Sequence, residues 1–413
     1  MNNIEKIKSF VDSCQADLAE EFKKTDDTAF FNFKKIHEAF QKNKVALRHF
    51  SGTSGYGYDD AGRDTLCKIF ADVFKAEKAI FSPNIVSGTH AITLALFGVL
   101  RPGDTLLSVS GDIYDTLQNV VNGKDIGSLR DFGINYDQIE LSDGQIDLSK
   151  VKETLKSNHA IKMVMVQRSR GYSWRSPIAI NQIEKLVQTV KEINRDIVVF
   201  VDNCYGEFVD LSEPTEVGAD LIAGSLIKNP GGGLAPTGGY IAGKSNLVDL
   251  VANRLTAPSI GMEVGSYLNG YQYFYQGLYQ SAHTVAQAIK GSMLFSYCLS
   301  KLGFETLPAP GEKFEDIICS IKFTTEEELI TFCQTIQYAS PVDSYVTPMP
   351  WDMPGYTDQV IMAAGCFVQG ASIELSCDSP IKKPYVAYLQ GSLSFEHAKL
   401  ALIYCLNRLN LIK

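Results

Sequence analysis

The sequence predicts an α/β protein, with a large domain built on a mainly parallel, seven-stranded type of sheet and a smaller C-terminal α+β domain. Strand-like and helix-like segments alternate between residues 78 and 243. One of these strands, DIVVFVDN at 196–203, is apolar enough to be buried on both faces, which is typical of parallel sheets. After about residue 306, short strands precede one last helix. This order of elements predicts a parallel sheet that is covered by helices, followed by a smaller α+β domain.

The individual elements follow from the spacing of apolar residues. Ile4, Ile7, Phe10 and Val11 recur at helical spacing, so residues 1–50 are expected to form an N-terminal helical segment. A glycine- and tyrosine-rich loop is expected at 50–64, and a long helical stretch at 264–303. We expect the large domain to span 51–290 and the small domain 291–413. The expected strands are 78–83, 104–109, 161–167, 196–203, 219–228 and 238–243, and the expected helices include 87–100, 181–193 and 395–410.

Composition narrows the class of protein. The net charge of −9 and the pI near 5.3 argue against a nucleic-acid partner, because such proteins usually carry a basic stripe. Nine cysteines lack CxxC pairs, which indicates free thiols in a reducing compartment rather than disulfides or a zinc site. The N-terminal segment is charged throughout and lacks the apolar central stretch that a signal peptide has. The longest apolar run, at 91–100, is too short to span a bilayer. We therefore expect a cytoplasmic protein with no membrane partner.

Two segments of the large domain are candidates for binding a phosphorylated cofactor. SGTHA at 87–91 opens a helix directly after a strand, and the N–H groups of a helix N-terminus bind phosphate. Alternatively, Ser87 is an ordinary N-cap. In VVFVDNCYGEF, Asp202 ends a buried strand, where α/β sheets bind ligands. It could keep a ring nitrogen protonated, or it could merely cap the next turn.

Two further residues extend the candidate site. Lys228 ends the run DLIAGSLIK and precedes NPGGG. A lysine that forms an imine should be partly neutral, so we expect it beside cations or away from water; the alternative is a solvated lysine on a hairpin. Tyr114 follows a strand and could stack on a flat ring, or belong to the core.

The order of these pieces resembles the fold-type I enzymes that use pyridoxal 5′-phosphate (PLP). VDNCY is similar to the VDNTY strand end of the cystathionine and methionine γ-lyases, and DLIAGSLIK keeps their aspartate-to-lysine spacing. QRSRGYSWRSP, KNPGGGLAPTGGYIAG and PWDMPGY with YLQGSLSFEHAKL resemble the aluminium-resistance, or methionine-γ-lyase-like, branch of the Cys/Met metabolism enzymes. The resemblance covers nearly the whole chain.

The resemblance implies a role for each matching residue. Lys228 would bond covalently to PLP, Asp202 would bind the pyridine nitrogen, and Tyr114 would stack on the ring. The other cofactor contacts that it implies are Ser87, Gly88, Thr89, Tyr205 and Ser225. In the γ-lyases a loop tyrosine reaches the phosphate of the neighbouring subunit; Tyr58 matches it best, and Tyr56 next. The implied assembly is a homodimer with shared sites, usually paired into a homotetramer.

The chain also departs from the γ-lyase pattern. Ile227 replaces a hydroxyl residue, and the arginine that follows the loop tyrosine has no counterpart at Asp60, although Arg63 is near. The arginine that binds the substrate carboxylate aligns near Tyr388. We expect Arg168 and Arg170, with Arg175 close by, to take over that role, because the guanidinium fork suits a carboxylate. The alternative is that these arginines lie at the surface or at a subunit contact.

The resemblance therefore implies a PLP-dependent carbon–sulfur lyase. Its substrate would be a sulfur-containing amino acid, cleaved by α,γ- or α,β-elimination with Lys228, Tyr114 and Asp202 as catalytic residues. Another PLP reaction, such as aldol cleavage or transamination, would keep the same cofactor residues. A non-catalytic PLP-binding protein is a further alternative, against which the intact Lys228 and Tyr114 count. No metal site is predicted, because no carboxylates cluster at ligand spacing.

Overall fold

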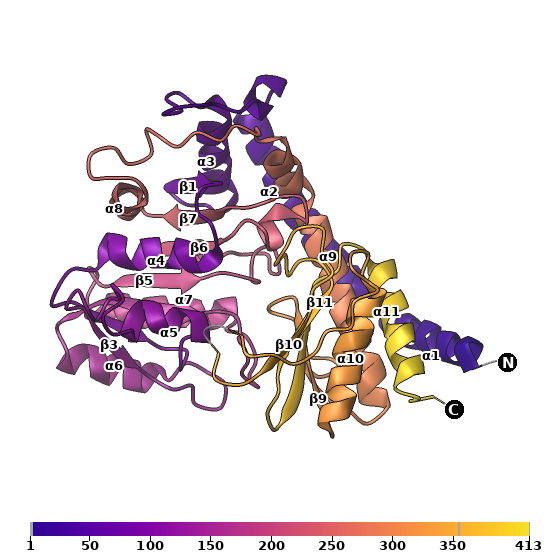
Figure 1. The fold of residues 1–413 in the computed structure, drawn as a ribbon. Helices are drawn as coiled ribbons and strands as arrows, with labels where there is room; N and C mark the ends of the chain where they lie inside the picture. The colour runs from indigo at the N-terminus through magenta and orange to yellow at the C-terminus, as the bar shows by residue number, and fades with distance from the viewer. Residues whose placement is uncertain (1–2, 354–355, 413) are drawn as a thin grey trace.

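The structure of the chain is a computed structural model that describes residues 3–353 and 356–412. The expected N-terminal helical segment consists of α1 (Asn3–Asp17), α2 (Ala19–Lys42) and the 3₁₀ turn η1 (Leu47–Phe50). Helix α2 packs along the long helix α9 (Gln272–Lys301), whereas α1 packs against the C-terminal helix α11 (Phe395–Arg408). This segment therefore connects the two parts of the molecule (Figure 1).

The large domain contains the predicted seven-stranded sheet, in the order β1-β7-β6-β5-β4-β2-β3. Neighbouring strands pair in parallel except β7, which runs antiparallel to β1 and β6, so the expectation of a mainly parallel sheet is confirmed. The strands are β1 (Lys78–Ser82), β2 (Thr105–Ser108), β3 (Asn135–Gln138), β4 (Ile161–Gln167), β5 (Val198–Asp202), β6 (Leu221–Ser225) and β7 (Gly239–Gly243).

Helices cover both faces of this sheet. Val198 and Phe200 of β5 pack into one hydrophobic core with α4, α5 and α8, while Val199 and Val201 pack into the other core. This division follows from the pleat, since successive strand residues point to opposite faces. The helices of the large domain are α3 (Ala61–Val73), α4 (Gly88–Val99), α5 (Asp115–Asn122), α6 (Leu148–Ser157), α7 (Ile180–Ile193) and α8 (Ser245–Leu255).

The small domain is a five-stranded antiparallel sheet in the order β10-β11-β12-β9-β8, with α9, α10 and α11 packed beside it (Figure 1). The expected division at residue 290 falls inside α9, a single helix of 30 residues. The remaining elements are β8 (Glu305–Leu307), β9 (Ile318–Phe323), α10 (Glu326–Ala339), β10 (Val360–Ala363), β11 (Ser376–Pro380) and β12 (Tyr385–Gln390).

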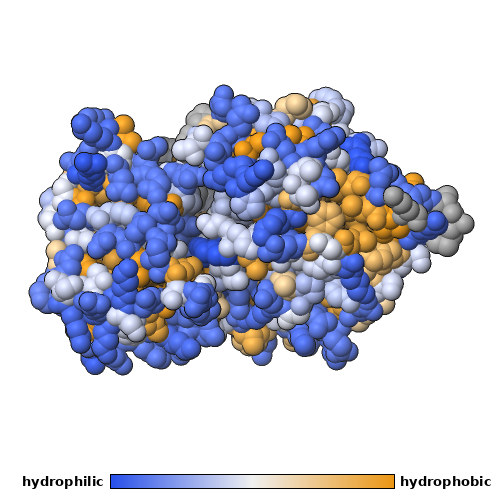
Figure 2. Space-filling model, turned by 90° about the horizontal axis from the view of Figure 1, so that it is seen from below, coloured by the Kyte–Doolittle hydropathy of each residue, from blue (hydrophilic) through white to orange (hydrophobic). Residues whose placement is uncertain are grey.

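The surface is mixed in character. Seen from below, hydrophilic residues cover most of the large domain, and hydrophobic residues gather toward the end where the termini lie (Figure 2). Within the described ranges, no helix is both long enough and apolar enough to cross a membrane.

Candidate active site

Three neighbouring strands end together and turn polar side chains to the same face of the large sheet. In β5 and β6, Val198, Phe200, Leu221 and Ala223 belong to the core under α4. The pleat therefore directs the next residues of that register, Asp202 and Ser225, toward α4 as well. Gln167 of β4 pairs with Asp202 and follows the same rule. The strand ends thus bring these three side chains to one edge of the sheet, as expected of a ligand site in an α/β fold.

The N-terminus of α4 completes this edge. Ser87 is the N-cap and its hydroxyl accepts a hydrogen bond from His90 N at 3.0 Å, so the ordinary capping role is confirmed. The other first-turn N–H groups, those of Gly88 and Thr89, have no acceptor within the helix. Ser225 packs against this turn, because a Cβ built on Gly88 would lie 3.4 Å from Ser225 Cβ. The first turn of α4 thus faces the strand ends directly.

Asp202 is a buried carboxylate, 4% exposed. Its Oδ1 accepts a hydrogen bond from Cys204 N at 3.1 Å. Burial raises the pKa of Asp202, and the charge of Lys228 acts in the opposite direction. The carboxyl group therefore lies where a charged partner would stabilise its ionised form. A protonated ring nitrogen would be such a partner.

Lys228 follows β6 and begins the 3₁₀ turn η2 (Asn229–Gly231). Its Nζ lies 3.9 Å from the ring centroid of Tyr205. Burial favours the neutral amine, but the groups around it, Cys204 and Tyr205 first, favour the ammonium, and the net effect raises the pKa of Lys228. The side chain is only partly exposed. Its raised pKa differs from the expectation of a partly neutral lysine, because it faces acidic groups instead of cations.

Tyr114 is held at the same edge by two contacts. Its hydroxyl is 3.1 Å from Thr89 Oγ1, and its backbone N–H donates to Gln167 Oε1 at 2.9 Å. Burial raises the pKa of Tyr114, so its phenol stays protonated at neutral pH. The structure therefore brings together Tyr114, Thr89, Asp202 and Lys228, which sequence motifs had singled out separately.

These residues fit PLP. At the phosphate end, the first turn of α4 offers N–H groups that have no acceptor within the helix. Gly88 leaves space beside them, since a Cβ at this residue would lie only 3.3 Å from Cys204 Sγ. At the ring end, Asp202 supplies a buried carboxylate, and Lys228 supplies the amine. A ligand with a phosphate, an aldehyde and a basic ring nitrogen matches this set of groups.

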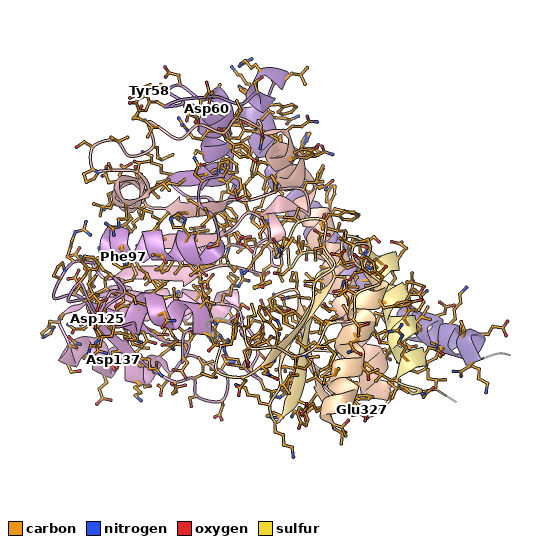
Figure 3. The ribbon with its side chains drawn as sticks, viewed as in Figure 1. Tyr58, Asp60, Phe97, Asp125, Asp137 and Glu327 are labelled. Carbon is orange, nitrogen blue, oxygen red and sulfur yellow. The ribbon has the colours of Figure 1, made fainter. Side chains whose placement is uncertain are left out.

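The loop tyrosines lie away from this edge. Tyr58 is 61% and Tyr56 71% exposed, and their rings pack against each other with centroids 5.5 Å apart. Figure 3 places Tyr58 and Asp60 at the far end of the large domain, beyond α3. Tyr58 therefore does not join the candidate site of its own chain. Its predicted contact with a neighbouring subunit stays a prediction.

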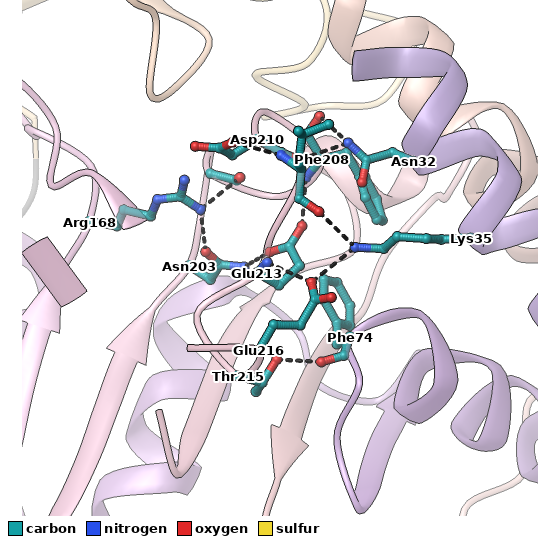
Figure 4. Close-up of polar contacts among 12 residues, drawn as sticks. Asn32, Lys35, Phe74, Arg168, Asn203, Phe208, Asp210, Glu213, Thr215 and Glu216 are labelled. Carbon is teal, nitrogen blue, oxygen red and sulfur yellow. Dashed lines mark hydrogen bonds and ion pairs between the residues drawn. The ribbon is translucent and has the colours of Figure 1, made fainter. Parts of the chain in front are cut away.

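Arg168 is fully buried and bonded inside the protein. Its Nη1 donates to Asn203 Oδ1 at 2.9 Å and to Gly206 O at 2.8 Å (Figure 4). Asn203 in turn donates to Glu213 Oε2 at 2.9 Å. This buried network holds the loop after β5 in place. The substrate-carboxylate role expected of Arg168 stays a prediction, and these internal partners count against it.

Arg170 is likewise committed to internal partners. It is 1% exposed and joins the two domains through Leu307 O at 2.8 Å, Ser320 Oγ at 3.2 Å and Asp316 Oδ1 at 3.3 Å. Arg175 donates to the carbonyls of Gln167 and Ser169. Burial, with the charge of Arg170, lowers the pKa of Arg175 to about 10. The expected substrate role of Arg170 also stays a prediction without support from its surroundings.

The departures from the γ-lyase pattern have structural counterparts. Ile227 points toward the small domain, since a Cβ on Gly370 would lie 3.7 Å from its Cδ1. Asp60 is the N-cap of α3 and accepts from Arg63 N at 3.0 Å. Arg63 itself is buried and donates to Gly57 O at 3.0 Å, which fixes the tyrosine loop. Tyr388 donates its hydroxyl to Tyr172 O at 2.6 Å.

Sequence reasoning missed residues that reach the site only through tertiary packing. Gln167 orients Tyr114, but nothing in IKMVMVQ marks its last residue as special. Ser372 of the small domain bonds the Tyr205 hydroxyl at 3.0 Å across more than 160 residues of sequence. Glu207, buried behind the site, accepts a hydrogen bond from Tyr240 at 2.9 Å. Of these three residues, only Glu207 could have been singled out from the sequence, because it is a charged residue directly after the VDNCY motif.

Comparison with known proteins places the chain among related sequences. The family model described as methionine gamma-lyase matches residues 7–410. An uncharacterized protein of Bacillus subtilis, YnbB, is 48% identical over 402 residues, which is 96% of this chain and 95% of that protein.

Solved structures agree with this placement. A candidate cystathionine beta-lyase involved in aluminum resistance from Clostridium acetobutylicum superimposes with a TM-score of 0.95 at 47% identity, over 98% of this chain and 95% of that one. A carbon-sulfur lyase involved in aluminum resistance from Clostridium novyi gives 0.94 at 48% identity, over 98% and 96%. At 15% identity, the pyridoxal-5′-phosphate dependent protein YhfS of Escherichia coli shares the fold, with a TM-score of 0.61 over 94% and 97%.

Proposed function

The chain belongs to the methionine gamma-lyase family, and from this premise we propose that it is a PLP-dependent carbon–sulfur lyase acting on a sulfur-containing amino acid. One observation carries the proposal. Lys228, Asp202 and the first turn of α4 meet at one edge of the sheet, where an amine, a carboxylate and free N–H groups match the three ends of PLP. The likeness to lyases of the aluminum-resistance group supports the class of reaction.

The bound cofactor would supply an electron sink for charge that develops at the substrate Cα. Asp202 would keep the ring nitrogen of the bound cofactor protonated through its buried negative charge. Lys228 would supply the amine that holds the cofactor, and the same amine would take the Cα proton of the substrate as general base. The first turn of α4 would hold the phosphate, and the Tyr205 ring lies 3.9 Å from Lys228 Nζ, against the lysine ammonium.

Tyr114 is the proposed acid for the leaving sulfur. Its phenol is protonated because burial raises its pKa, and Thr89 fixes the hydroxyl. In β-elimination the Cβ–S bond breaks, and sulfur leaves with the electron pair and takes up a proton. The balanced overall reaction converts a thioether amino acid and water into a thiol, a 2-oxo acid and an ammonium ion. In γ-elimination the Cγ–S bond breaks instead.

We also propose that the site is completed by a second copy of the chain. Tyr58 and Tyr56 are exposed on one loop, which the buried Arg63 holds through its hydrogen bond to Gly57 O. Tyr58 therefore points to solvent, away from the candidate site of its own chain. A rigid loop that exposes two aromatic rings is suited to insertion into a partner.

The direct test is a screen of purified, cofactor-loaded protein against sulfur amino acids, with 2-oxo acid and thiol measured together. We expect both products in equal amounts from at least one of S-alkylcysteines, cystathionine and methionine. Release of neither product from any of them would contradict the proposal. A 2-oxo acid without thiol would indicate transamination instead.

A further inference from the structure

We infer that Gln167 is a positioning residue, which holds Tyr114 where its hydroxyl can protonate the leaving sulfur. This inference rests on the proposed function and adds a residue to the same site. Gln167 is the last residue of β4 and is 4% exposed. A buried amide group needs a partner for its oxygen and for its nitrogen. In Gln167 both partners belong to segments that fix Tyr114.

The first of these contacts fixes the backbone of Tyr114. Its N–H group donates to Gln167 Oε1 at 2.9 Å, so the acceptor is a side chain and not a carbonyl. Tyr114 is the N-cap of α5, and its carbonyl accepts a hydrogen bond from Leu117 N at 2.9 Å. At the far end of the side chain, the hydroxyl is 3.1 Å from Thr89 Oγ1. Thr89 thus places the hydroxyl, while Gln167 places the backbone that carries the ring.

The second contact holds a loop against the same tyrosine. Gln167 Nε2 donates to Ser169 O at 3.1 Å, in the loop that follows β4. Gly171 in this loop has a φ of 56°, and a Cβ built on it would lie 3.8 Å from Tyr114 Cβ and 3.6 Å from Gln167 Nε2. The loop also accepts a hydrogen bond from β12 of the small domain at 2.6 Å. One amide group therefore connects Tyr114 with the segment that contacts the small domain.

The position of Tyr114 matters because the proposed reaction needs a proton from its hydroxyl. Burial raises the pKa of Tyr114, so the phenol holds this proton at neutral pH. An alkanethiolate is a strong base, and its departure is fast only when an acid protonates sulfur as the C–S bond breaks. A displaced acid lowers the rate of that step by up to about 100-fold. A leaving group that needs no proton is insensitive to the displacement.

Two small substrates separate these cases. β-Elimination from S-ethylcysteine and from 3-chloroalanine yields the same 2-oxo acid, pyruvate, together with ammonium. The first compound releases ethanethiol, which takes up a proton, and the second releases chloride, which does not. Gln167→Met keeps the length of the side chain and removes both hydrogen bonds. We expect its kcat on S-ethylcysteine to fall by about 10- to 100-fold, with KM and the turnover of 3-chloroalanine within about threefold of wild type.

Three further variants serve as controls. Tyr114→Phe should show the same selective loss on S-ethylcysteine, and the double variant with Gln167→Met should be no slower than Tyr114→Phe, because Gln167 acts through that hydroxyl. Gln182→Met is the matched control. Gln182 is a glutamine of α7, 9% exposed, whose Oε1 likewise accepts a backbone N–H, from Ile146 at 3.2 Å. This variant should leave both turnover rates unchanged.

Hydrogen exchange measures the positioning bond without turnover. In the cofactor-loaded wild type, Gln167 Oε1 protects the amide of Tyr114. Gln167→Met should let this amide exchange at least about tenfold faster, because its acceptor is gone. Gln167→Glu keeps an oxygen for the same N–H and should retain the protection. Mass spectrometry of a short peptide that contains Tyr114 reads the exchange.

The outcomes distinguish the inference from the function on which it rests. Equal losses of Gln167→Met on both substrates would overturn the inference and leave the lyase function intact. Additive losses in the double variant, or an unchanged Tyr114 amide in Gln167→Met, would do the same. If the wild type forms pyruvate from neither compound, the proposed function fails together with the inference.

Discussion

Lys228 Nζ lies 3.9 Å from the centroid of the Tyr205 ring, and the hydroxyl of this tyrosine is 3.0 Å from Ser372 Oγ in the small domain. Tyr205 thus connects the lysine of the large domain with the loop before β11. It occupies this place with a φ of 71°, a backbone conformation uncommon outside glycine. The position of the small domain and that of the lysine are therefore coupled through one side chain.

This coupling predicts the behaviour of two conservative variants. Tyr205→Phe and Ser372→Ala each remove one partner of the same hydrogen bond, and each should lower the free energy of unfolding by about 1 kcal/mol. The double variant should be no less stable than either single variant, because the bond is already lost. Urea denaturation of the four proteins measures this directly. Additive losses would show that the two hydroxyls act independently.

Asp202→Asn keeps the shape of the side chain and removes its charge. We expect turnover to fall at least about 100-fold, since a ring nitrogen without an ionised partner stabilises developing charge poorly. Cofactor retention should fall much less, because the first turn of α4 and Lys228 still hold the other two ends. Turnover and bound cofactor are measured on the same preparation. Near wild-type turnover would exclude Asp202 from the mechanism.

Glu207 predicts a pH dependence of stability. Its side chain is fully buried, and Oε2 has no hydrogen-bond partner within the described residues. Burial raises the pKa of Glu207 to about 8, although Tyr240 acts to lower it. The folded protein therefore holds a proton that the unfolded chain releases above its ordinary pKa near 4.5. Stability should fall by about 1.4 kcal/mol per pH unit between these two values and level off above the higher one.

Glu207→Gln should abolish this part of the slope, because the amide does not titrate. The variant should thus gain stability relative to wild type as the pH rises from 5 to 8. Chemical denaturation at several pH values checks the sign. A wild type and variant with parallel pH profiles would show that Glu207 is ionised in the folded protein.

The shared site is tested by mixing two inactive variants. Tyr58→Phe and Lys228→Ala would be defects in different halves of one composite site. Random reassortment of equal amounts gives about half mixed dimers, each with one intact site, and so about a quarter of full activity. Tyr58→Phe must first be clearly impaired alone; if it is not, Tyr56→Phe replaces it. A mixture that stays inactive despite demonstrated exchange of subunits would contradict a site formed by two chains.

The fold was predictable where burial imposes a strong pattern. Strands β5 and β6 are apolar up to a last polar residue, all of their residues are buried, and both were expected. Strand β3 was missed because it is an edge strand whose residues, Asn135–Gln138, are polar and alternate between exposed and half-buried. Helix α3 starts at Ala61, inside the expected loop, because Asp60 caps it. Because Asp60 lies within the stretch that was expected to be a loop, the sequence did not mark it as the N-cap of a helix.

The sequence predicted those residues of the candidate site that lie in short motifs at the ends of strands or the starts of helices. Thr89, Asp202 and Lys228 follow strands or open helices, so their meeting at one edge could be inferred from topology. Ser372 comes from the small domain, and its approach to Tyr205 depends on how the two sheets pack. The arginines of QRSRGYSWR were expected to face substrate, but a guanidinium can equally bond buried carbonyls. Spacing alone does not distinguish these uses.

The most direct test of this account is to locate the covalent cofactor. Purified protein loaded with PLP should be yellow, and borohydride should fix the cofactor as a stable secondary amine on one lysine. Peptide mass spectrometry should find this modification on Lys228, and Lys228→Ala should carry none after the same treatment. Modification of a different lysine, or borohydride-stable cofactor on Lys228→Ala, would contradict the central claim that the edge formed by β5, β6 and α4 is the PLP site.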